Sequence, residues 1–302
     1  MYLFNNKKYG RIRDWLEIWR PFSWTATIIP VLLAGVVAGN SGRFSWAVFL
    51  PILVGVLLVQ GAANIVNEYY DYKNGIDKPG QARPSTVLAE DRINSEVALK
   101  TARFIMVVFL LTAFIYSIVL NNWYLLIFAL LGVGGAYYYT APPLELKYWG
   151  LGLLSVFLFF GLLLSQAVHV ALTGAMNNIV YWLVLPVALL ISAILHGNDL
   201  RDIKRERKIV TIAGKLGLKR GVFLYLLLIF IPYLLVFISV VLGIVSYWGL
   251  IVFVTFPLAV SGAKKSLRGL KGDWEKLAGL DVESAKLNIL FGCCWLLALF
   301  IT

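Results

Sequence analysis

Residues 64–77 read Asn-Ile-Val-Asn-Glu-Tyr-Tyr-Asp-Tyr-Lys-Asn-Gly-Ile-Asp and place acids and amides directly after an apolar segment. On a helix, Asn64, Glu68 and Asp71 are spaced i, i+4 and i+7, so all three project from one face. Gly75 permits the turn that a helix needs at its end, and Asp77 lies just beyond that turn. The spacing therefore predicts a helix that ends in one polar, acidic face.

A second stretch of the same kind follows a later apolar run. Residues 198–206 read Asn-Asp-Leu-Arg-Asp-Ile-Lys-Arg-Glu. Asp199, Asp202 and Glu206 are spaced i, i+3 and i+7, which again gives one acidic face. Carboxylates this dense beside lipid repel one another unless a cation neutralises them. Oxygen ligands without Cys or His favour Mg²⁺, so two such faces, opposed, are predicted to hold this ion between them.

The composition places both stretches in a membrane protein. The 302 residues are 60% hydrophobic and only 14% charged, and the chain repeatedly supplies the roughly 20 apolar residues that span a bilayer as a helix. We expect an all-α, polytopic membrane protein with nine transmembrane helices. The expected segments are residues 22–39, 46–66, 97–120, 123–140, 150–173, 180–197, 221–243, 246–263 and 286–301.

The basic residues are unevenly distributed among the connections. Of the 27 Lys and Arg residues, only Arg43 lies in the short connections or the C-terminal tail. By the positive-inside rule, the N-terminus and the long loops that carry both acidic stretches are cytoplasmic. We expect a multi-pass protein of the cell membrane. The net charge of +11 then reflects topology and anionic ligands, so neither nucleic acid nor an obligate protein partner is expected.

The first twenty residues are expected to lie on the membrane surface. Ile12, Trp15, Leu16 and Trp19 recur at helical spacing among charged residues, which is typical of an amphipathic interfacial helix. We treat residues 1–20 as the interfacial N-terminal segment of a single transmembrane domain over residues 1–302.

Basic residues accompany both acidic stretches. They are Arg20 before the first apolar segment, Lys78 and Arg83 after the first stretch, Lys147 in the third long loop and Arg201 within the second stretch. A diphosphate site requires this combination, because Mg²⁺ together with Arg or Lys offsets the charge of the ligand. Tyr139, beside a Pro-Pro turn, offers a hydroxyl donor, although interfacial anchoring also explains a single aromatic residue.

These residues carry a resemblance to a known family. The pattern Asn64-x-x-Asn67-Glu68-x-x-Asp71-x-x-x-Gly75-x-Asp77, followed by Arg83-Pro84 and later by Asn198-Asp199-Leu200-Arg201-Asp202-x-x-x-Glu206, resembles the UbiA superfamily of intramembrane prenyltransferases. It is most similar to the branch that prenylates 1,4-dihydroxy-2-naphthoate in menaquinone biosynthesis, over essentially the whole chain. Glu68 and Glu206 depart from the family, which usually has Asp at both positions.

The resemblance implies a helical bundle around a central cavity that cytoplasmic loops cap. It also implies Mg²⁺-dependent transfer of a polyprenyl group from polyprenyl diphosphate to an aromatic acceptor, through an allylic carbocation. The implied metal ligands are Asn64, Glu68, Asp71 and Asp77 with Asp199, Asp202 and Glu206, and the implied diphosphate ligands are Arg20, Lys78, Arg83, Tyr139, Lys147 and Arg201. Asp71, Asp199, Asp202 and Lys147 are the implied catalytic residues.

Two kinds of alternative stay open at this point. Relatives that alkylate 4-hydroxybenzoate or a glycerophosphate lipid share the Arg83-Pro84 feature, so the acceptor is not fixed by it. A secondary transporter also has acids within the membrane, but its coupling sites usually lie near the midplane of the bilayer. Both acidic stretches here lie at predicted helix ends on one side, which favours the enzyme.

Overall fold

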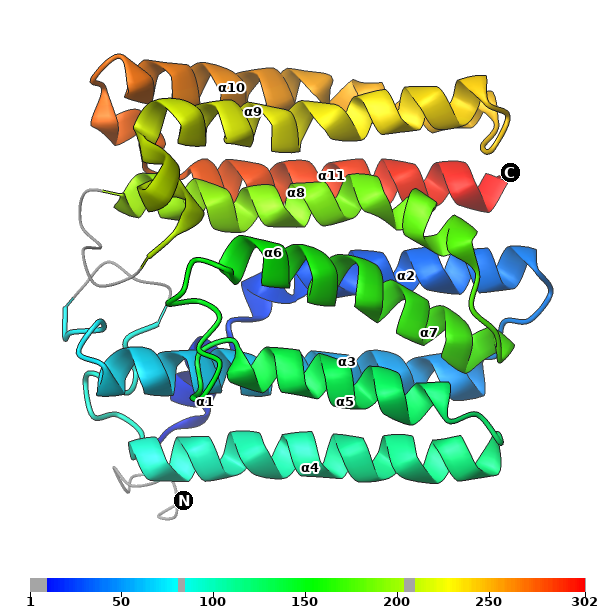
Figure 1. The fold of residues 1–302 in the computed structure, drawn as a ribbon, viewed down its shortest axis with the longest axis horizontal. Helices are drawn as coiled ribbons and strands as arrows, with labels where there is room; N and C mark the ends of the chain where they lie inside the picture. The colour runs from blue at the N-terminus through cyan, green and yellow to red at the C-terminus, as the bar shows by residue number, and fades with distance from the viewer. Residues whose placement is uncertain (1–9, 81–84, 204–209, 302) are drawn as a thin grey trace. The chain divides into compact units, whose positions relative to one another are not determined.

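The computed structural model describes residues 10–80, 85–203 and 210–301. Within these ranges every regular element is a helix, and no strand occurs among the described residues (Figure 1). The elements of the first half are α1 (Ile12–Trp19), the 3-10 helix η1 (Pro21–Trp24), α2 (Thr25–Asn40), α3 (Trp46–Lys73), α4 (Ser95–Val119) and α5 (Tyr124–Tyr138).

The second half continues in the same way. Its elements are α6 (Gly152–Val156), the π-helix η2 (Phe157–Leu163), α7 (Leu164–Thr173), α8 (Asn178–Asp202), α9 (Ile212–Val241), the 3-10 helices η3 (Tyr247–Thr255) and η4 (Trp274–Leu277) on either side of α10 (Phe256–Leu270), and α11 (Leu280–Ile301).

Each predicted apolar segment coincides with a helix or a continuous helical stretch. In the described part of the chain, eight stretches are long and apolar enough to cross a membrane, and α5 is a shorter apolar helix. The all-α, polytopic class is therefore confirmed. The helices that carry the acidic stretches run past their apolar segments, since α3 continues to Lys73 and α8 to Asp202. Both acidic stretches consequently begin on helices, as their spacing predicted.

The chain divides into two compact units. The first contains residues 1–24 and 50–146, and the second contains residues 25–49 and 147–302. In the first unit, the core joins Ile18 of α1, Ile65 of α3 and Ala98 of α4, and α4 packs along α5. Helix α1 is amphipathic: Ile18 is fully buried while Ile12 and Leu16 are exposed, and its location at the lipid surface stays a prediction.

The second unit is built around α8, which packs against α9, α11 and α2. Its core includes Leu33 of α2, Val187 of α8 and Phe291 of α11. Helix η2 approaches α8 closely at Gly161, where a Cβ atom would lie 2.4 Å from the side chain of Ala188. Glycine is therefore required at this contact, because a larger residue would push η2 away from α8.

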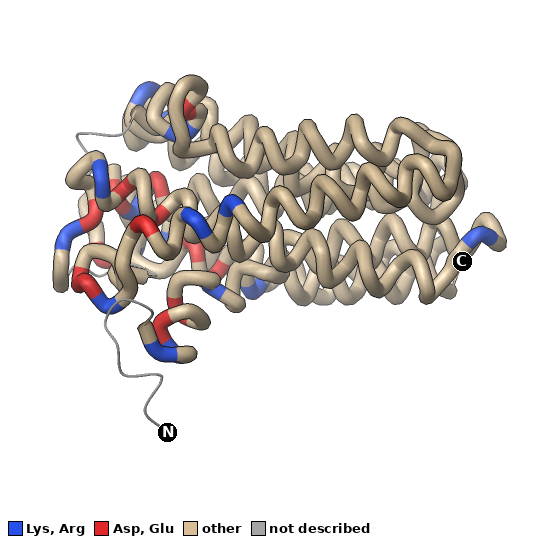
Figure 2. The backbone as a smooth tube through the Cα atoms, turned by 90° about the horizontal axis from the view of Figure 1, so that it is seen from below, with Lys and Arg blue, Asp and Glu red and all other residues tan. Residues whose placement is uncertain are grey.

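Charged residues gather at one end of the helices within each unit (Figure 2). In the second unit, the end of α8, the start of α9 and the end of α10 carry acids and bases. The exception in that unit is Arg43, whose side chain donates 2.9 Å to the carbonyl of Thr173 at the end of α7. This distribution matches the charge pattern behind the topology prediction, and the cytoplasmic assignment itself stays a prediction.

Candidate active site

The first acidic stretch closes α3 with two buried carboxylates. The helix ends at Lys73, and Gly75 takes the left-handed conformation that the sequence predicted, with φ +66°. The backbone N–H groups of Ile76 and Asp77 then donate to the carbonyl of Asp71, at 2.8 Å and 3.2 Å. This turn brings the backbones of Asp71 and Asp77 together, and their side chains are 3% and 4% exposed.

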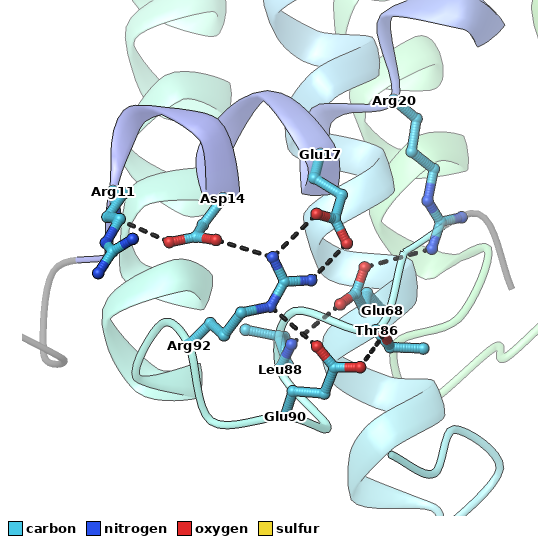
Figure 3. Close-up of polar contacts among 9 residues, drawn as sticks. All are labelled: Arg11, Asp14, Glu17, Arg20, Glu68, Thr86, Leu88, Glu90 and Arg92. Atoms are coloured by element: carbon cyan, nitrogen blue, oxygen red, sulfur yellow. Dashed lines mark hydrogen bonds and ion pairs between the residues drawn. The ribbon is translucent and has the colours of Figure 1, made fainter. Parts of the chain in front are cut away.

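Glu68, one turn earlier on α3, is fully buried and engaged on both oxygens (Figure 3). Its Oε2 accepts from Nη2 of Arg20 at 3.3 Å, and its Oε1 accepts from the backbone N–H of Leu88 at 3.0 Å. The structure thus joins a predicted diphosphate ligand to a predicted metal ligand. It also joins both to residues 85–94, the segment between Arg83-Pro84 and α4.

Asn64 holds the connection between α1 and η1. Its amide nitrogen donates to the carbonyl of Trp19 at 2.9 Å and to the hydroxyl of Ser23 at 3.3 Å. Gln60, one turn earlier on α3, donates to the carbonyl of Ser23 at 2.9 Å. Two amides of α3 therefore fix the backbone on both sides of Arg20.

Sequence reasoning missed a second arginine in this unit. Arg92 binds Asp14 and Glu17 of α1, with 2.8 Å from Nη1 to each, and Nε pairs with Glu90 at 3.0 Å (Figure 3). Nη2 makes a further short contact with Glu17. The hydrogen bond that Arg92 donates to Glu17, aided by the one it donates to Asp14, raises the pKa of Arg92 above its ordinary value. The available signal was two acids at i, i+3 on an amphipathic helix, which does not identify their partner.

The second acidic stretch is organised by Arg201. Its Nη2 and Nε contact Asp202 at 2.7 Å and 3.1 Å, and its Nη1 donates to Asp281 at the start of α11 at 2.7 Å. Nη2 also makes a short contact with Asn198. Arg201 therefore connects the end of α8 to α11. Asp281 was missed because it belongs to no spaced group of acids in the sequence.

The remaining predicted residues differ in how far they are exposed. Asp199, Lys147 and Tyr139 are partly buried, and Lys78 is exposed. The ammonium of Lys147 lies 5.8 Å from the ring centroid of Tyr148. Two predicted site residues, Arg83 and Glu206, lie outside the described residues.

The oxygen donors fit Mg²⁺ held jointly with a ligand. No group of three or more His, Cys, Asp or Glu side chains placed to hold a metal is found within residues 10–80, 85–203 and 210–301. Mg²⁺ commonly binds through only one or two carboxylates, with water and substrate phosphates completing its octahedral shell. The buried carboxylates Asp71 and Asp77 supply donors of this kind at the charged end of α3.

Comparisons of the sequence agree with these features. Residues 27–280 match the model of the UbiA prenyltransferase family. A relative from Xenopus tropicalis, named UbiA prenyltransferase domain-containing protein 1, is 32% identical over 282 residues, which cover 90% of this chain and 77% of the relative. The 1,4-dihydroxy-2-naphthoate octaprenyltransferase of Bacillus subtilis is 28% identical over 250 residues, which cover 82% of this chain and 80% of that enzyme.

Solved structures share the fold at lower identity. A UbiA homologue from Archaeoglobus fulgidus, bound to DMAPP and Mg²⁺, has a TM-score of 0.61 at 16% identity, and the match covers 94% of this chain and 99% of that one. A structure described for digeranylgeranylglyceryl phosphate synthase has a TM-score of 0.65 at 18% identity, covering 96% and 99%. The chain therefore belongs to the UbiA prenyltransferase family, and the expectation of a membrane-embedded prenyltransferase is confirmed.

Proposed function

We propose that this prenyltransferase moves a polyprenyl group from polyprenyl diphosphate to 1,4-dihydroxy-2-naphthoate, with Mg²⁺ as cofactor. The observation that carries the proposal is the charged end of the first unit. There, the buried Asp71 lies one turn after the acid that holds the guanidinium of Arg20, and the buried Asp77 lies just beyond the end of α3. A site for a metal diphosphate needs acids that bind the cation and an arginine, held in place, that binds the anion.

The proposal assigns the two acidic stretches to one reaction. Mg²⁺ would be held by side-chain oxygens of Asn64, Asp71, Asp77, Asp199, Asp202 and Glu206. Glu68, whose two oxygens accept from Arg20 and Leu88, has a different role. The diphosphate-binding residues are Arg20, Lys78, Arg83, Tyr139, Lys147 and Arg201. When bound, Mg²⁺ neutralises the charge that develops on the leaving diphosphate. The arginines and lysines orient the diphosphate and add donors to its oxygens.

The chemistry is an exchange of substituents on the acceptor ring. The allylic C–O bond breaks, and its electron pair leaves with the diphosphate. The ring carbon that bears the carboxylate forms the new C–C bond, and the carboxylate departs as carbon dioxide while its electron pair restores the aromatic ring. The apolar helices exclude water from the allylic cation, which favours attack by the ring over hydrolysis.

The acceptor rests on similarity of sequence. The Bacillus subtilis relative is named for 1,4-dihydroxy-2-naphthoate, and the sequence pattern resembles that branch. The relatives named UbiA prenyltransferase domain-containing protein 1 state no acceptor in their name. An electron-rich dihydroxy ring is also a competent carbon nucleophile for an allylic cation. We place the charged helix ends, and thus the reaction, at the cytoplasmic side of the cell membrane.

The test supplies the purified protein with geranylgeranyl diphosphate, Mg²⁺ and one acceptor at a time, and measures the mass of the product. We expect product with 1,4-dihydroxy-2-naphthoate and loss of carbon dioxide. Product only with 4-hydroxybenzoate or a glycerophosphate lipid would overturn the proposed acceptor.

A substitution tests the metal ligands. Asp71→Asn should lower kcat by about 100-fold or more, because a metal ligand loses its charge. Asp91→Asn is the matched control at an exposed acid, where asparagine tolerates the φ of +53°.

A further inference from the structure

The buried carboxylate of Glu68 is already committed to two partners from this chain. Its side chain has no solvent exposure, and it accepts from Nη2 of Arg20 at 3.3 Å and from the N–H of Leu88 at 3.0 Å (Figure 3). A Mg²⁺ ligand must present a lone pair about 2.1 Å from the ion in near-ideal octahedral geometry. An enclosed carboxylate that holds an arginine and a backbone amide is poorly suited to this role.

Arg20, by contrast, retains donors for an anion. Its guanidinium has five N–H donors, and the bond to Glu68 uses one of them. Its Nε atom is buried and has no hydrogen-bond partner among the described residues. A buried donor without an acceptor is costly, so this atom is where a ligand oxygen gains most.

The backbone around Arg20 is fixed as well. Arg20 ends α1 in the left-handed conformation, with φ +52° and ψ +61°, which is unfavourable for a residue with a Cβ atom. Its N–H donates to the carbonyl of Glu17 at 3.2 Å, and its own carbonyl accepts from the hydroxyl of Ser23 at 2.8 Å. With the backbone held, the direction of the guanidinium depends on its side-chain partner, which is Glu68.

We propose that Glu68 is a positioning residue that aims Arg20 at the diphosphate, and not a metal ligand. This inference rests on the proposed function. By holding Leu88, the same carboxylate also anchors residues 85–94, whose Val87, Leu88 and Ile93 are buried. The family usually has Asp at this position. In this chain the longer side chain of Glu contacts both Arg20, at the end of α1, and Leu88, within residues 85–94.

Glu68→Gln separates the two roles. The glutamine oxygen still accepts from the N–H of Leu88, so residues 85–94 stay anchored. Its amide NH₂ group then faces the guanidinium of Arg20, and because both groups are donors the hydrogen bond between them is lost. We expect the KM for the prenyl diphosphate to rise by about tenfold. The Mg²⁺ concentration for half-maximal rate should not change. Glu90→Gln is the matched control, because it removes an acid that pairs with Arg92, which lies outside the diphosphate set.

A double-mutant cycle with Arg20→Met gives the decisive readout. If Glu68 acts through Arg20, the KM of the double variant equals that of Arg20→Met alone. Additive effects, or a Glu68→Gln variant whose Mg²⁺ requirement rises several-fold, would overturn the proposal.

A binding measurement keeps this test separate from the proposed function. Geranylgeranyl thiolodiphosphate does not ionise readily, and its affinity in the presence of Mn²⁺ is measured by electron paramagnetic resonance without turnover. Weaker analogue binding in Glu68→Gln, with unchanged Mn²⁺ affinity, supports positioning even if no acceptor yields product. Weaker Mn²⁺ affinity refutes it. If Glu68→Gln does not fold, the same measurement is made on Glu68→Asp. Aspartate keeps the negative charge, but its shorter side chain does not extend as far toward Arg20.

Discussion

Replacing Arg92 with methionine should loosen α1 and residues 85–94 together. Arg92 contacts two acids of α1, Asp14 and Glu17, and one acid of its own segment, Glu90. Methionine keeps much of the side-chain length and apolar packing but removes every donor. Three acids are then left close together without their common counter-charge, so the variant loses attraction and gains repulsion.

The magnitude follows from how exposed each acid is. The side chains of Glu17 and Glu90 are 30% and 36% exposed, so water replaces much of their pairing and each loss is worth at most about 1 kcal/mol. Asp14 is only 10% exposed, and losing a partner there costs about 1–3 kcal/mol, limited because Asp14 still accepts from the N–H of Arg11 at 2.8 Å. The total is about 3 kcal/mol, which is roughly 100-fold in a local opening equilibrium.

Amide hydrogen exchange of the detergent-solubilised protein measures this opening. In Arg92→Met, the amides of residues 11–20 and 85–94 should exchange about 100-fold faster and in concert, while those of α4 and α5 keep their wild-type rates. Arg43→Met is the matched control, because Arg43 is an exposed arginine that donates to the backbone carbonyl of Thr173 and belongs to neither segment. Exchange in residues 11–20 that stays at the wild-type rate, or that rises without a change in 85–94, would refute the coupling.

Two further predictions address the topology and the second unit. In a chain whose native cysteines are replaced, a cysteine introduced at the exposed Glu275 should react with an impermeant thiol reagent only from the cytoplasmic side. A cysteine introduced at the exposed Ala175 should react only from outside. The reverse pattern would refute the orientation inferred from the charges. Asp281→Asn should lower the free energy of unfolding by about 1 kcal/mol, because Arg201 loses one of its ionic partners, and denaturation at or above the wild-type midpoint would contradict this.

Local features of the fold were predictable from the sequence because their causes are local. Apolar length specifies a spanning helix, and the spacing of Asn64, Glu68 and Asp71 specifies a shared helical face. Gly75 marks the end of α3 because a left-handed residue closes a helix, and its φ of +66° confirms that reading. The same reasoning identified the amphipathic α1 from four apolar positions.

The partners of the charged residues were not predictable in this way. Arg20 and Glu68 are 48 residues apart, Arg92 and Asp14 are 78 apart, and Arg201 and Asp281 are 80 apart. No local period connects such pairs, since helix packing alone brings them together. From the sequence alone, each acid in the two acidic stretches is predicted to be a metal ligand. The structure shows that an acid can instead hold an arginine.

A buried carboxylate needs a counter-charge, and a metal ion and a guanidinium both supply one. In each unit, an arginine proposed for the diphosphate is held by an acid: Arg20 by Glu68, and Arg201 by Asp202 and Asp281. Holding a long side chain in advance removes the conformational entropy that ligand binding would otherwise cost, about 2 kcal/mol for arginine. More acids than a metal requires are therefore expected beside arginines that bind diphosphate. The high density of acids in the two acidic stretches then reflects two roles, which are binding the metal and holding the arginines.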